Sequence, residues 1–159
     1  MANMIDCTSE DRFPTRKNPR MRGYDYATPN YYFITICTNQ KKCLFWSNGK
    51  LNRYGRIAYD AIMQISEHFP GNRVEKFVVM PNHIHMILVV EPGGKDTSVV
   101  VGSFKSRVSK VVHQIHPELR LWQVSYHDHC IRNQQQYEHI WMYIETNPMR
   151  WEKDCFYTE

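Results

Sequence analysis

The sequence predicts an α+β fold of the ferredoxin-like kind: a β-α-β-β-α-β core with an antiparallel sheet, followed by one extra C-terminal helix. Two observations lead to this prediction. Stretches of β-branched and aromatic residues alternate with stretches whose apolar residues recur at helical spacing. The chain has 159 residues, of which 42% are hydrophobic and 23% are charged. These values are ordinary for a single soluble domain.

The first half of the core begins with a strand. Residues 31–38 (YYFITICT) are β-branched and aromatic, which is typical of a strand. Residues 39–50 read as a loop, in which Asn48-Gly49 marks a turn. From Asn52 to about His68 the apolar residues recur every three or four positions, which predicts a helix.

Two strands and their connection follow that helix. Pro70-Gly71-Asn72 ends the helix. Residues 74–80 (VEKFVVM) and 83–91 (HIHMILVVE) are then rich in β-branched and apolar side chains. They predict a hairpin joined at Pro81-Asn82.

The second half repeats the alternation. We expect a helix from about Thr97 to Gln114 and a short strand within residues 121–131. The last helix is expected from about Asn133 to Asn147, where Asn147-Pro148 ends it. The expected buried stripe of the second helix is Val101, Phe104, Val108 and Val111.

The chain divides into a basic arm, residues 1–29, and a single domain, residues 30–159. Residues 12–24 carry five basic side chains and no acidic one. Such an arm commonly contacts nucleic acid, and the alternative is a solvated tail. The basic residues are Arg12, Arg16, Lys17, Arg20 and Arg22.

The cellular setting is expected to be cytoplasmic. The N-terminus is too polar for a signal peptide, and no apolar run is long enough to span a bilayer. The five cysteines form no C-x-x-C pair, so free thiols are expected. His127, His129 and Cys130 could hold zinc, but a matching second pair is missing.

His83-Ile84-His85 stands at the start of an expected strand. Because strand side chains alternate, both imidazoles project from one face, where they can ligate one divalent cation. The pattern alone is unspecific, and two structural histidines at a strand end are the alternative.

The last helix adds Tyr143 and Asn147, which lie four residues apart and therefore stack on one helix face. A tyrosine one turn before a carboxamide can present its phenol beside a metal. Alternatively, the ring packs at the edge of the core with its hydroxyl in water.

Three segments in this order resemble one protein family. VVMPNHIHMILVV, LWQVSYHDHCIRN and YIETNP together are similar to the single-tyrosine HUH transposases, and most of all to the REP-associated tyrosine transposase branch. The stretch GYDYATPNYYFITICTNQKKCLF resembles the N-terminal strand region of that branch. The resemblance covers roughly residues 16–154.

The resemblance implies a metal-dependent endonuclease and strand transferase (a transposase) that acts on single-stranded or hairpin DNA. It implies that His83 and His85 bind Mg²⁺ or Mn²⁺ and that Asn147 is a third polar ligand. Tyr143 is then the nucleophile, ahead of the competing Tyr126 and Tyr137. Its attack would give a 5′-phosphotyrosine and a free 3′-hydroxyl. The phosphotyrosine would keep the energy of the phosphodiester bond for the rejoining step.

Partners and alternatives follow from the same reading. We expect a prokaryotic, nucleoid-associated protein that contacts no membrane and is a monomer or a homodimer. The alternatives are a non-catalytic or host-adapted DNA-binding protein on the same fold, and a phosphoesterase that uses water instead of tyrosine. The candidate DNA contacts are Arg16, Lys17, Arg20, Arg22, Arg107 and Lys110.

Overall fold

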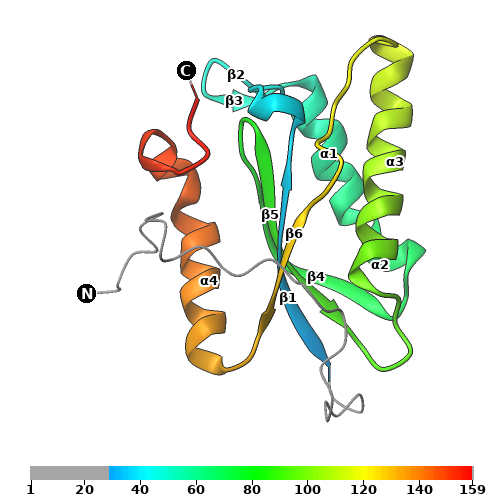
Figure 1. The fold of residues 1–159 in the computed structure, drawn as a ribbon, viewed down its shortest axis with the longest axis vertical. Coiled ribbons are helices and arrows are strands. Elements are labelled where there is room, and N and C mark those ends of the chain that lie inside the picture. Colours follow the sequence, from blue (N-terminus) through cyan, green and yellow to red (C-terminus); the bar gives the residue numbers. More distant parts are fainter. Residues whose placement is uncertain (1–28, 159) are drawn as a thin grey trace.

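The computed structural model describes residues 29–158. The predicted basic arm, apart from Pro29, therefore lies outside the described residues. The described part forms a four-stranded antiparallel sheet with the order β4-β5-β1-β6 (Figure 1). This order is that of a ferredoxin-like β-α-β-β-α-β core, as predicted. The strands are β1 (Asn30–Cys37), β4 (Asn72–Val79), β5 (His83–Val90) and β6 (His127–Ile131).

Helices cover both faces of this sheet (Figure 1). Helices α1 (Arg53–Met63), α2 (Ile65–His68) and α3 (Thr97–Ile115) lie on one face, over the larger hydrophobic cluster. Helix α4 (Gln134–Thr146) lies on the other face, where Ile140 and Ile144 pack against Phe33 and Ile87 of the sheet. The sheet therefore separates two apolar cores.

Several local expectations are corrected. Residues 39–50 contain a 3-10 turn, η1 (Asn39–Lys41), and a hairpin of β2 (Trp46–Ser47) and β3 (Lys50–Leu51). The hairpin turns at Asn48 and Gly49, with φ of 52° and 74°, which is the conformation that Asn-Gly favours. The expected first helix is interrupted at Gln64.

The stripe of α3 differs by one position from the expectation. Val111 is 41% exposed, whereas Val112 and Val100 are buried with Val101, Phe104 and Val108. At 100° per residue, Val111 and Val112 lie on opposite sides of the buried stripe of α3. Packing against α1 buries Val112 and leaves Val111 exposed.

Helix α4 is fixed to the edge strand β4 by polar contacts. The Tyr137 hydroxyl donates to Glu75 Oε2 at 2.6 Å, and Lys76 forms an ion pair with Glu145. At its start, the Asn133 side chain caps the helix by accepting from the Gln136 amide at 2.8 Å. These contacts hold the helix in one position over the sheet.

The sequence predicted that helical structure ends at Asn147, but the chain stays helical beyond it. It continues as a 3-10 helix, η2 (Asn147–Lys153), with Pro148 in its first turn, where a proline is tolerated. The segment after η2 returns to the body of the domain, where Asn82 Nδ2 donates to the carbonyl of Phe156 at 2.6 Å. The tail thus covers the first residues of β5.

Cysteine chemistry and membrane character were also predicted. Cys37, Cys43 and Cys130 are not disulfide-bonded. Cys155 is disulfide-bonded, so the expectation of free thiols is wrong there. Local spacing rules such as C-x-x-C do not detect cysteines that are far apart in the chain.

Among residues 29–158, no helix has the length and apolar character needed to cross a bilayer.

Candidate active site

His83 and His85 lie side by side on the face of β5 that α4 covers. Their neighbours Ile84 and Met86 point into the opposite core, as strand alternation requires. The two imidazole rings are 4.5 Å apart between centroids, and both residues are almost fully buried. The structure therefore brings the two histidines together.

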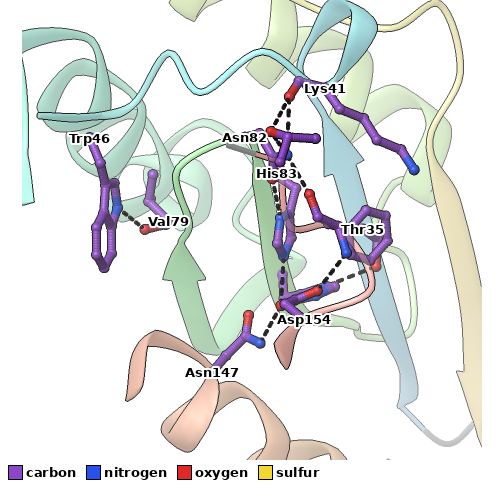
Figure 2. A network of polar contacts seen from close by, with 11 residues as sticks. Thr35, Lys41, Trp46, Val79, Asn82, His83, Asn147 and Asp154 are labelled. Carbon is purple, nitrogen blue, oxygen red and sulfur yellow. Dashed lines mark hydrogen bonds and ion pairs between the residues drawn. The ribbon is translucent and has the colours of Figure 1, made fainter. Parts of the chain in front are cut away.

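The hydrogen bonds of Asn82 fix the tautomer of His83 (Figure 2). Asn82 Nδ2 donates to the carbonyls of Lys41 and Phe156, so its Oδ1 faces His83 as an acceptor. His83 Nδ1 donates to this oxygen at 2.8 Å. The proton is then on Nδ1, and Nε2 carries a free lone pair.

His85 is held in a comparable way. Its Nδ1 lies 2.9 Å from Thr35 Oγ1 on the paired strand β1. The Nε2 atoms of both histidines are buried and have no hydrogen-bond partner among the described residues. Two unpartnered imidazole nitrogens in one buried place could ligate a metal ion.

Burial keeps both rings neutral. It lowers the pKa of His83 from 6.5 to about 3, and the side chain of Asn147 opposes this shift only in part. The pKa of His85 is lowered well below its ordinary value, mainly by burial and also by its neighbour His83. At neutral pH each ring is therefore in the state that ligates metal.

Tyr143 and Asn147 approach the histidine pair from α4 and from the start of η2. The centroid of the Tyr143 ring lies 5.3 Å from that of the His85 ring. It lies 6.2 Å from the centroid of the Phe33 ring, and these two rings pack in a T-shaped arrangement. Burial raises the pKa of Tyr143, and the nearby Asp154 raises it further. Asn147 is 3% exposed, and its Oδ1 is buried with no hydrogen-bond partner in the described chain.

Asp154 completes the cluster, although no local sequence motif indicates it. Its side chain is fully buried, with Oδ2 at 3.8 Å from His83 Nε2 and accepting from Asn147 Nδ2 at 2.6 Å (Figure 2). Burial raises the pKa of its carboxyl. His83, His85 and Asp154 offer ligand atoms that all lie within 4.8 Å of one another. Among the described residues, this is the group of side chains whose ligand atoms lie close enough together to hold a metal ion. His127, His129 and Cys130, which the sequence offered as zinc ligands, do not belong to it.

The competing tyrosines lie elsewhere. The Tyr126 hydroxyl is 2.9 Å from Thr97 Oγ1, beside the core under α3. The Tyr137 hydroxyl is committed to Glu75 on β4. Of the three tyrosines considered from sequence, Tyr143 has its ring against the histidine pair.

The predicted DNA-contact residues are not gathered at this site. Arg107 and Lys110 stand on α3, which covers the other face of the sheet, and Arg107 donates to Gln64 Oε1 at 2.6 Å. Arg16, Lys17, Arg20 and Arg22 lie outside the described residues.

A cleft of about 680 Å³ opens next to the site, between the β2–β3 hairpin and η2. Pro81, which directly precedes Asn82, forms part of its wall. The aromatic side chains of Trp46, Trp151 and Tyr157 line it together with the basic Arg150 and Lys153. Aromatic and basic side chains together are the combination that binds single-stranded nucleic acid.

A ferredoxin-like sheet with two adjacent histidines on a central strand, faced by a tyrosine on a C-terminal helix, is the arrangement of the single-tyrosine HUH proteins. The chain belongs to the IS200-like transposase family, whose model matches residues 27–147.

Individual relatives agree with this assignment. An uncharacterized protein of Haemophilus influenzae is 31% identical over 169 residues, covering 91% of this chain and 94% of that protein. The REP-associated tyrosine transposase of Escherichia coli K12 is 26% identical over 132 residues, covering 81% and 72%. A solved structure of a REP-associated tyrosine transposase bound to a REP hairpin has the same fold. It has a TM-score of 0.64 at 23% identity and covers 84% of this chain and 73% of that one.

Proposed function

We propose that this protein is a metal-dependent single-stranded DNA endonuclease and strand transferase that forms a 5′-phosphotyrosine through Tyr143. One observation carries the proposal: the Tyr143 ring lies 5.3 Å from His85, one of two buried neutral histidines whose Nε2 atoms have no hydrogen-bond partner in the described chain. This arrangement puts a nucleophile beside a place suited to a cation.

His83, His85 and Asn147 would hold the ion. Two imidazole nitrogens and an amide oxygen fit a divalent cation, and Mg²⁺ or Mn²⁺ is the proposed one. When bound, such an ion supplies positive charge next to the scissile phosphate. Asn82 and Thr35 contact the Nδ1 atoms of His83 and His85. These contacts fix the orientation of both rings before DNA binds.

The protein's own step is the attack by Tyr143. Its pKa is raised, so the phenol is protonated at neutral pH and must lose its proton as the new bond forms. The phenolic oxygen bonds to phosphorus, the bond from phosphorus to the 3′-oxygen breaks, and that oxygen takes up a proton. The reverse step, with a different 3′-hydroxyl, rejoins DNA without ATP.

The DNA partner is proposed to be single-stranded or hairpin DNA. The cleft between the β2–β3 hairpin and η2 supports this, because its aromatic side chains offer faces for stacking bases. A relative's solved structure is named as bound to a REP hairpin, which favours a hairpin here as well. The arm residues Arg12–Arg22 are proposed to hold phosphates.

Two proposed contacts come from the far side of the sheet. Arg107 and Lys110 on α3 would reach DNA only where it passes around the domain, away from the histidines. A nucleoid-associated, cytoplasmic location follows from a DNA substrate. Either a monomer or a homodimer is compatible with this proposal.

The test is a covalent adduct on a single-stranded oligonucleotide that carries a hairpin and a label at its 3′ end. The 5′-phosphotyrosine keeps that label on the protein, so the wild type with Mn²⁺ should give a labelled band on a denaturing gel. Tyr143→Phe should give none, and the matched control Tyr137→Phe should keep it.

Three other results would overturn the proposal in different ways. An adduct mapped to another tyrosine would refute the site. Metal-dependent cleavage without any adduct would indicate a phosphoesterase that uses water. Tight DNA binding with neither cleavage nor adduct would indicate a non-catalytic binding protein.

A further inference from the structure

We infer that Asp154, from the segment after η2, is an additional and anionic ligand of the metal bound by His83 and His85. The inference rests on the proposed function, because it concerns the same ion. The last sequence motif of the site, YIETNP, ends at Pro148, so Asp154 lies outside it. It comes to the histidines through the return of the chain after η2.

The position of the carboxylate is the first argument. The side chain of Asp154 has no exposed surface, and its Oδ2 lies 3.8 Å from His83 Nε2. Two ligands each ~2.1 Å from one ion stand ~3 Å apart when adjacent and ~4.2 Å apart when opposite. The observed separation falls between these limits. All three ligand atoms, including one from His85, lie within 4.8 Å of each other.

The charge balance is the second argument. A buried carboxylate costs free energy unless a cation or enough hydrogen bonds compensate it. Among the described residues, the ion-pair contact of Asp154 within 4.0 Å is with His83, at 3.8 Å, and neither side chain has exposed surface. Arg150 stabilises the charged carboxyl, but burial outweighs it and raises the pKa of Asp154. A divalent cation between the carboxylate and the two imidazoles would supply the missing positive charge.

The hydrogen bonds leave the carboxylate correctly oriented for this role. Oδ1 accepts from the backbone amide of Phe156 at 2.9 Å, and Oδ2 accepts from Asn147 Nδ2 at 2.6 Å. Oδ2 keeps a second lone pair on the side of His83. Asn147 directs its Nδ2 to Asp154 and leaves its Oδ1 unpartnered. The two residues therefore form one oriented pair of oxygen donors.

The rings around the site fix this segment against the histidines. Phe156 lies over His83 with 4.5 Å between ring centroids, and Asn82, which orients His83, also holds the carbonyl of Phe156. The Thr158 hydroxyl donates to the carbonyl of Lys41 at 3.2 Å. A carboxylate on a segment held at several points is positioned before metal binds.

Direct binding of Mn²⁺ to the full-length, DNA-free protein tests the inference. Titration calorimetry should show that Asp154→Asn weakens binding by about tenfold or more, because fewer anionic ligands lower the affinity of a hard cation. The matched control is Glu152→Gln, which removes the same charge from an exposed position two residues away. It should bind Mn²⁺ like the wild type, and equal affinity of Asp154→Asn and wild type would overturn the inference.

Thermal unfolding separates a ligand from a structural acceptor. If Asp154 only holds the tail, Asp154→Asn lowers the melting temperature equally with and without Mn²⁺, which overturns the inference. If it binds the ion, the rise in melting temperature caused by Mn²⁺ shrinks in the variant.

A ligand exchange keeps the inference falsifiable where Asp154→Asn folds poorly. Asp154→Cys should change the preference from Mn²⁺ to Cd²⁺, because a thiolate favours a soft ion. Glu152→Cys is the control for the free thiols of the chain, and an equal change in both variants would refute the assignment.

The adduct assay distinguishes this inference from the proposed function. Normal Mn²⁺ binding and normal adduct formation in Asp154→Asn would refute the ligand and leave the function intact. Mn²⁺ binding that depends on Asp154 in a wild type that never forms an adduct would support the ligand and refute the function.

Discussion

Acid should destabilise this protein through the two site histidines. In the unfolded chain each imidazole has a pKa of about 6.5, whereas burial lowers that of His83 to about 3 in the folded state. At pH 5 the unfolded state binds a proton that the folded state does not, so stability falls as pH falls below 6.5. The carboxyl of Asp154 has the opposite sign, because burial raises its pKa and protonation there favours the folded state.

The size of the effect follows from the two pKa values. Between pH 7 and pH 5, His83 alone removes about 2 kcal/mol from the free energy of unfolding. Burial also lowers the pKa of His85, so its protonation in the unfolded chain adds to this loss. A loss of about 2 kcal/mol is by itself a large part of the stability of an ordinary domain.

Urea unfolding at pH 7 and pH 5, in the presence of a chelator, measures this loss. His83→Gln should lose about 2 kcal/mol less than the wild type over the same interval, and His85→Gln should also lose less than the wild type. His127→Gln removes an exposed histidine on β6 and should behave like the wild type. An equal acid loss in the wild type and in both site variants would refute the neutral, buried state of the pair.

Three other predictions concern the fold and the DNA contacts. Deleting residues 1–22 should weaken binding of single-stranded DNA and flatten its salt dependence by about 0.7 in log–log slope per lost phosphate contact; fluorescence anisotropy at two salt concentrations checks this, and unchanged affinity at both would exclude the arm. Tyr137→Phe should cost about 1 kcal/mol because Glu75 loses a hydrogen bond, whereas Tyr143→Phe should cost less, as urea unfolding can measure. Gly55→Ala should destabilise by about 1–3 kcal/mol, since its Cβ would lie 2.3 Å from the carbonyl oxygen of Phe45; a melting temperature equal to that of the wild type would contradict this.

The fold could be predicted from the sequence because its strands and helices carry strong periodic patterns. The strand residues 31–38 and 83–91 are long and rich in β-branched side chains. The observed β1 is shifted by one residue at each end, and β5 ends one residue earlier than predicted. The β2–β3 hairpin was missed apart from its turn, because strands of two residues have no periodicity.

The candidate site was only partly predictable. The i, i+2 spacing of the histidines and the i, i+4 spacing of Tyr143 and Asn147 place each pair on one face. Nothing local indicates Asp154, because its proximity to His83 depends on the return of the chain after η2. Charge along α3 likewise does not tell which face of the sheet the helix covers, so the sequence alone does not indicate that Arg107 and Lys110 lie on the face opposite the histidines.

The origin of the site residues has a kinetic consequence. Tyr143, the two histidines and Asp154 come together within a single polypeptide, from α4, from β5 and from the tail. In the proposed enzyme, a site assembled in this way would take its nucleophile from the same molecule. We therefore expect turnover per molecule to be independent of dilution, and we expect two damaged copies, one without the phenol and one without the imidazoles, to stay inactive when mixed.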